Sequence, residues 1–223
     1  MSKFWRENSL SIVVFLMFLF SVGGQAITGN MEYNQDQEDH GEQGVGFVEY
    51  LGTGHFIEAI FENWESEFLQ MATYVVLTIF LRQKGSSESK KLEGKEPVDA
   101  DPRDEKERKK KDVPGPVKAG GFILKLYENS LTIAFVALFL MSFALHAFGG
   151  TEEYNQDQLA HGGETVSMLQ YLTTSRMWFE SFQNWQSEFL SIFTLVILTV
   201  FLRQRGSPES KPVAAPHYET GTE

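Results

Sequence analysis

The chain has 223 residues, of which 42% are hydrophobic, and it carries a formal net charge of −11 at pH 7 without any cysteine. The absence of cysteine excludes disulfides, thiol catalysis and cysteine-ligated zinc. The only basic run, 108–111, lies among acidic residues, so the composition does not favour nucleic acid as a partner.

The sequence is one unit written twice. The motif Glu-Tyr-Asn-Gln-Asp-Gln begins at Glu32 and returns 121 residues later at Glu153, and His-Gly follows it both times. The alignment of 7–90 with 128–211 needs no gap, and 42 of its 84 paired positions are identical. This duplication predicts two structural repeats, residues 1–84 and 121–206.

Each copy begins with an apolar run, about 9–27 in the first and 130–148 in the second. A helix of that length measures roughly 28 Å, close to the ~30 Å of a hydrocarbon core. The first run resembles a secretory signal peptide, but its duplicate lies in the middle of the chain, where no signal peptide occurs. We therefore predict that both runs are transmembrane helices.

A second apolar run ends each copy, after a polar and acidic stretch without sustained periodicity. Aromatic residues at helical spacing lead from about Phe56 into this run, which predicts transmembrane helices at about 64–82 and 185–203. Aromatic and cationic residues near the ends of the apolar runs are expected to anchor them at the membrane interface. These anchors are Trp5, Trp64, Trp185, Arg82 and Arg203.

The linker 85–120 and the tail 207–223 contain all seven prolines and few large apolar residues, which predicts disorder. The predicted fold class is an all-α membrane protein of four transmembrane helices, arranged as two in–out–in hairpins. Of the 19 Lys and Arg residues, only Arg176 falls in the predicted outer segments. The positive-inside rule then places both termini and the linker in the cytoplasm, and makes the two repeats parallel rather than inverted.

The outer segments contain the residues best suited to hold a divalent cation. Carboxylates and amides are ligands for Ca²⁺ or Mn²⁺, and a nearby histidine suits a transition metal. The candidate ligands are Glu32, Asp36, His40, Glu153, Asp157 and His161. The alternative is a hydrogen-bonded turn that holds the outer ends of two helices together.

Glu67 and Glu188 lie in the repeated motif Trp-x-Ser-Glu-Phe-Leu, about one turn inside the predicted interface. An ionisable group at that depth suggests function, and the alternative is a carboxylate that reaches headgroup water. His146 stands where the first copy has Gln25, and its position favours a hydrogen-bonded helix end over a metal ligand.

No catalytic motif is recognisable in the sequence. We therefore expect a non-enzymatic binding component with acidic outward-facing loops, in contact with the lipid bilayer and with a second copy or another membrane protein. The alternative is a small channel or transporter that oligomerises around Glu67 and Glu188. A membrane enzyme ranks third.

Four motifs carry a resemblance to a known family. They are Phe4-Trp5-Arg6-Glu7-Asn8-Ser9-Leu10, Glu-Tyr-Asn-Gln, Asn-Trp-x-Ser-Glu-Phe-Leu and Phe-Leu-Arg-Gln-x-Gly. With them the chain resembles a family of bacterial integral membrane proteins classified only as a domain of unknown function. The resemblance implies a location in the bacterial inner membrane and supplies no activity or site.

Overall fold

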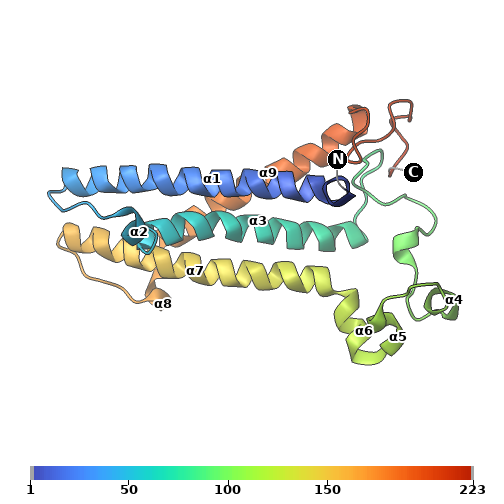
Figure 1. The fold of residues 1–223 in the computed structure, drawn as a ribbon, viewed down its shortest axis with the longest axis horizontal. Coiled ribbons are helices and arrows are strands. Elements are labelled where there is room, and N and C mark those ends of the chain that lie inside the picture. The colour runs from blue at the N-terminus through green and yellow to red at the C-terminus, as the bar shows by residue number, and fades with distance from the viewer. Residues whose placement is uncertain (1–2, 222–223) are drawn as a thin grey trace. The chain divides into compact units, whose positions relative to one another are not determined.

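The structure is a computed structural model that describes residues 3–221, and its regular structure is entirely helical (Figure 1). The long helices are α1 (Lys3–Asp39), α3 (Gly54–Phe80), α7 (Ser130–Ala160) and α9 (Ser175–Phe201). Short helices complete the described chain: α2 (Phe47–Tyr50), a 3₁₀ turn η1 (Pro97–Asp99), α4 (Glu105–Arg108), α5 (Gly115–Ala119), α6 (Gly121–Glu128) and α8 (Met168–Tyr171).

The chain forms two compact units. Unit 1 comprises Met1–Phe61 and Ala144–Met177, and unit 2 comprises Glu62–Phe143 and Trp178–Glu223. Unit 1 therefore contains α1, α2, α8, the first turns of α3 and the last turns of α7. Unit 2 contains the linker, the tail and most of α3 and α9.

Three of the described helices, α1, α7 and α9, are long and apolar enough to cross a membrane. Their most apolar stretches have mean hydropathies of 2.2, 2.2 and 1.3. Large apolar side chains on α1 are exposed, among them Phe20 at 83% and Leu10 at 77%. Such a surface is unfavourable in water and favourable in lipid, so the helices indicate a multi-pass membrane protein.

Helix α1 continues well past the apolar run, to Asp39, whereas the sequence predicts an irregular segment from Thr28 onward. Helix α7 likewise continues to Ala160. The polar residues that extend these helices form helix readily, but they give no apolar periodicity. The predicted boundary was therefore the end of the apolar surface and not the end of the helix.

The repeated His-Gly sequence ends both helices. Gly41 and Gly162 adopt the left-handed conformation, with φ of 77° and 74°. At the end of α1 the amide of Glu42 donates to the carbonyl of Gln37, and the amide of Gly41 donates to that of Glu38. These two bonds form a Schellman motif, which satisfies carbonyls that a helix end leaves open.

The tail contains a buried lysine, although its composition predicts disorder. Lys211 is 1% exposed, and its Nζ donates to the carbonyls of Pro216, His217 and Glu219 at 3.2, 3.1 and 2.8 Å. The amide of Gly221 also donates to the carbonyl of Ser86, at the start of the linker. These contacts give the described tail a defined path within unit 2.

Candidate functional site

The asparagine of the repeated motif clamps the outer loop of each copy within unit 1. The Asn34 side chain accepts from the Val45 amide at 2.7 Å and donates to the Val45 carbonyl at 3.0 Å. Asn155 makes the same two bonds with Val166, at 2.7 and 3.0 Å. A side-chain amide that satisfies both polar groups of one residue fixes the loop against the helix.

A buried tyrosine supports each clamp from α2 or α8. Tyr50 is 1% exposed and Tyr171 is 0% exposed. A Cβ at Gly29 would lie 2.2 Å from the Tyr50 hydroxyl, and a Cβ at Gly150 would lie 2.4 Å from that of Tyr171. Only glycine leaves room for these hydroxyls, so the two glycines allow the tyrosine rings to pack directly against the helix backbone.

The Tyr50 hydroxyl lies 3.1 Å from Nδ1 of His55, whose Nε2 lies 3.4 Å from the Glu32 carboxylate. Burial, together with the nearby Glu32 charge, raises the pKa of Tyr50 to about 12. The phenol is therefore neutral at physiological pH, and its proton is available for hydrogen bonding.

The six residues predicted to bind a metal have other neighbours in the structure. Glu32 pairs with His55, and Nδ1 of His40 lies 2.8 Å from the Asp36 carbonyl. In the second copy, Nδ1 of His161 lies 2.8 Å from the Asp157 carbonyl, and the Arg176 guanidinium pairs with the Asp157 carboxylate at 2.7 Å. The hydrogen bond of His40 raises its pKa, which favours the charged imidazole beside Asp36.

Glu153 brings the two copies into electrostatic contact within unit 1. Its carboxylate is close enough to interact with Asp36 and Asp157, and with His55 and Arg176. Within the described range 3–221, however, the six predicted ligands do not gather three donor atoms within 4.8 Å of one another. A metal at this outer cluster stays a prediction.

A second polar group lies deeper in unit 1, where α3 meets α7. Glu58 is 7% exposed and His146 is 0% exposed, and a carboxylate oxygen and a ring nitrogen of the two lie within 4.8 Å. The buried Tyr171 hydroxyl donates to Oε1 of Glu58 at 3.3 Å. Sequence reasoning missed Glu58, because the second copy has Phe179 at the paired position.

Among the predicted intramembrane acids in unit 2, Glu67 is exposed and Glu188 is half-buried. The fully buried acid is instead Glu65, whose Oε1 accepts from Nε1 of Trp185 at 2.9 Å. One turn further, the Gln70 amide donates to Oγ of Ser191 at 2.9 Å. Helical phase therefore turns Glu65, and not Glu67, toward α9.

The predicted interface anchors lie at helix ends or within the aromatic segments. Trp5 is 37% exposed, near the start of α1, and Trp64 is half-buried. Arg82 donates to the carbonyls of the helix end it follows, those of Thr78, Ile79 and Leu81. Arg203 repeats this arrangement with Thr199, Val200 and Leu202. Both arginines therefore close a helix C-terminus, where a cation is favoured.

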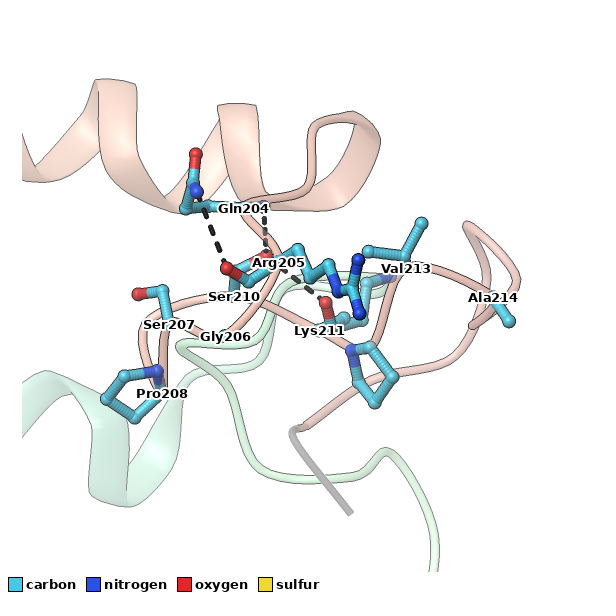
Figure 2. A pocket seen from close by; sticks show the side chains of 10 residues that line it. Gln204, Arg205, Gly206, Ser207, Pro208, Ser210, Lys211, Val213 and Ala214 are labelled. Carbon is cyan, nitrogen blue, oxygen red and sulfur yellow. Dashed lines mark hydrogen bonds between the residues drawn. The ribbon is translucent and has the colours of Figure 1, made fainter.

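An open hollow of about 790 Å³ lies in the tail (Figure 2). It follows a turn in which the backbone N–H of Gln204 donates to Oγ of Ser210 at 2.9 Å. The first copy forms the same turn, with the backbone N–H of Gln83 donating to Oγ of Ser89 at 2.9 Å. The hollow is lined by Gln204, Arg205, Gly206, Ser207, Pro208, Ser210, Lys211, Pro212, Val213 and Ala214. Because Lys211 already donates to three carbonyls, Arg205 is the main charged group on its rim.

No curated protein and no solved structure matches the chain. One family model does match, over residues 1–222, and it is described as a domain of unknown function, DUF6766. The match covers nearly the whole chain and confirms the resemblance that the repeated motifs indicate. The chain therefore belongs to the DUF6766 family, a domain of unknown function.

Proposed function

We propose that the protein is a non-enzymatic binding component of the bacterial cytoplasmic membrane that presents an ordered acidic surface on the outer side. The observation that carries this proposal is the pair of asparagine clamps, Asn34 with Val45 and Asn155 with Val166. They hold polar loops in the same conformation in both copies, as a surface for recognition requires.

In the proposed arrangement four helices cross the membrane as two parallel hairpins. The fourth crossing is the part of α3 from Trp64 onward, which the duplication pairs with the apolar part of α9. Its exposed apolar side chains, such as Phe80 at 73% and Ile79 at 49%, suit a lipid environment.

Contacts between paired positions support the parallel relation. Gln70 bonds to Ser191, which is its own equivalent 121 residues later. Glu88 and Glu209, also 121 residues apart, are close enough to repel each other. When equivalent residues meet each other at two levels, a local two-fold axis runs along the helices between the copies. Parallel repeats have this geometry, and inverted repeats do not.

The orientation rests on charge. Arg82 and Arg203 close α3 and α9, and the positive-inside rule favours a cytoplasmic position for such cations, so we assign the acidic ends of α1 and α7 to the outer side. Burial and the Glu209 charge raise the pKa of Glu88 on the proposed cytoplasmic side.

Cysteine labelling tests this topology, because the chain has no native cysteine. Single cysteines at Ser2, Ala100 and Thr222 are expected to resist an impermeant maleimide in intact cells, whereas cysteines at Gly44 and Thr165 are expected to react. Ser2 and Thr222 lie outside the described residues. Reaction at Ala100 before lysis contradicts the four-helix arrangement.

Ion flux distinguishes the binding component from the channel or transporter alternative. That alternative depends on Glu67 and Glu188, and Glu67 is exposed on the single chain. We expect proteoliposomes to show no more flux than empty liposomes. Flux that disappears in Glu67→Gln/Glu188→Gln but persists in the matched variant Glu62→Gln would establish the channel and refute our proposal.

A further inference from the structure

The sequence places its candidate cation ligands in the outer loops, but the most enclosed carboxylate and imidazole of unit 1 lie deeper, between α3 and α7. We propose that Glu58 and His146 bind a divalent transition metal ion at this helix crossing. This site is separate from the outer cluster of Glu32, Asp36, His40, Glu153, Asp157 and His161, and it goes beyond the proposed function.

Glycines at the crossing bring the two backbones together. A Cβ at Gly54 would lie 2.8 Å from the carbonyl oxygen of Gly149, and a Cβ at Gly149 would lie 2.5 Å from the amide nitrogen of Glu58. Residue 54 of α3 approaches 149, 152 and 153 of α7, while residue 58 approaches 149. The helices are therefore antiparallel here, so advancing along α3 means going back along α7.

This register accounts for the meeting of the two ligands. Glu58 lies one turn after Gly54, and His146 lies about one turn before Gly149, so both side chains reach the same level. Their donor atoms lie within 4.8 Å of each other. Two donors that each lie about 2.0–2.2 Å from one ion are at most about 4.4 Å apart, so at the 4.8 Å limit a shift of less than about 1 Å is enough to bring both donors onto it.

Burial and chemistry favour a metal here. A carboxylate that is 7% exposed and an imidazole that is 0% exposed have lost most of their hydration, which is unfavourable for a charged group unless it is compensated. An ion bound by both groups would add to the compensation that the Tyr171 hydrogen bond gives Glu58. An imidazole with a carboxylate suits Zn²⁺, Mn²⁺ or Fe²⁺ better than Ca²⁺, which prefers oxygen ligands.

Tyr171 completes the arrangement as a positioning residue. Its hydroxyl donates to Oε1 of Glu58 at 3.3 Å, which orients the carboxylate. Hydrogen bonds from an outer shell of this kind fix the direction of a ligand and tune its affinity. Water completes the coordination.

The duplication supplies a matched comparison. In the first copy, Gln25 occupies the position of His146, and its side-chain amide donates to the Ala59 carbonyl at 3.3 Å. Phe179 occupies the position of Glu58 in the second copy. The two ligands therefore occur together only at the crossing of α3 with α7, which predicts one ion per chain.

The test uses the full-length protein purified in detergent and treated with chelator. Metal analysis after dialysis against Zn²⁺ or Mn²⁺ measures stoichiometry, and the thermal midpoint is followed as each metal is added, with Ca²⁺ for comparison. We expect one bound ion, a midpoint that rises with Zn²⁺ or Mn²⁺ but not with Ca²⁺, and a loss of affinity of at least about tenfold in His146→Gln and Glu58→Gln.

The controls separate this site from the outer loops and from misfolding. Asp36→Asn/Asp157→Asn removes carboxylates of the outer cluster and is expected to keep the full metal response. If the His146→Gln variant and the wild type have the same thermal midpoint in the presence of chelator, the variant is folded. Mn²⁺ electron paramagnetic resonance provides a second readout, since the bound signal is expected in the wild type and absent from both ligand variants. A wild type that binds no ion, or a response that persists in both ligand variants, overturns the proposal.

Discussion

Replacing Gly149 with alanine is expected to destabilise the folded protein by about 1–3 kcal/mol. The added methyl would lie 2.5 Å from the amide nitrogen of Glu58 and 2.9 Å from the carbonyl oxygen of Gly54. Both atoms belong to the backbone, so neither can rotate away, and α3 and α7 must separate. Alanine is a better helix former than glycine by about 1 kcal/mol, which means that the measured loss understates the steric cost.

Gly24→Ala is the matched control, because a Cβ at Gly24 of α1 meets no atom within 4 Å. That variant is expected to leave stability unchanged or to raise it by up to about 1 kcal/mol. Denaturant unfolding in mixed micelles, followed by tryptophan fluorescence, measures both variants. Equal stabilisation of the two proteins would contradict the close crossing of α3 and α7.

Removing one asparagine clamp is expected to cost about 1–3 kcal/mol, because Asn34→Ala leaves the amide of Val45 without its side-chain partner and leaves the carbonyl with only the longer bond from Asn30, at 3.4 Å. Asn155→Ala is expected to have a similar effect through Val166, since its bonds have the same lengths. The losses are expected to add in the double variant, because the two clamps share no residue.

Asn34→Asp distinguishes the two bonds of the clamp. A carboxylate accepts from the Val45 amide but cannot donate to its carbonyl, so an intermediate loss is expected. Gln35→Ala is the control, because Gln35 is the exposed next residue of the same helix. Unfolding measurements together with protease sensitivity of the loop provide the readout. A loss in Gln35→Ala as large as that in Asn34→Ala would show that the motif acts through something other than the clamp.

The sequence was sufficient for the apolar parts of the helices, since a long apolar run has few alternatives to a spanning helix. It failed at the outer ends, where α1 continues through Asp39 and α7 through Ala160. Residues such as Glu and Gln are compatible with helix or loop, and the Schellman glycines Gly41 and Gly162 were the only local signal for the true ends.

Helical phase could not be predicted where the two copies differ. Glu67 is retained in both copies and lies inside the predicted interface, yet it is exposed, while Glu65 is fully buried opposite Trp185. Choosing residues that are retained in both copies selects residues that have the same role in each copy. A contact between the copies can instead join two residues that are not equivalent, and this choice does not find them.

The same limit explains why Glu58 was missed. Its meeting with His146 depends on the approach of α3 to α7 at Gly54 and Gly149, which are not equivalent positions in the duplication. Gly23 and Gly24 are adjacent small residues in an apolar helix, but a Cβ at either meets nothing within 4 Å. Only the three-dimensional register identifies which glycines bring helices together.

The length of α1 has an electrostatic consequence. From Thr28, just beyond the predicted apolar span, to its end at Asp39, the helix advances by roughly 18 Å, which is about twice the screening length of physiological saline. The headgroups take up about 6 Å of that advance, so the charge of Asp39 still lies more than one screening length beyond them, whereas Asp36 lies about one turn closer. A cationic partner captured at Asp39 should dissociate as ionic strength rises, and its affinity should change little when anionic lipid is exchanged for neutral lipid.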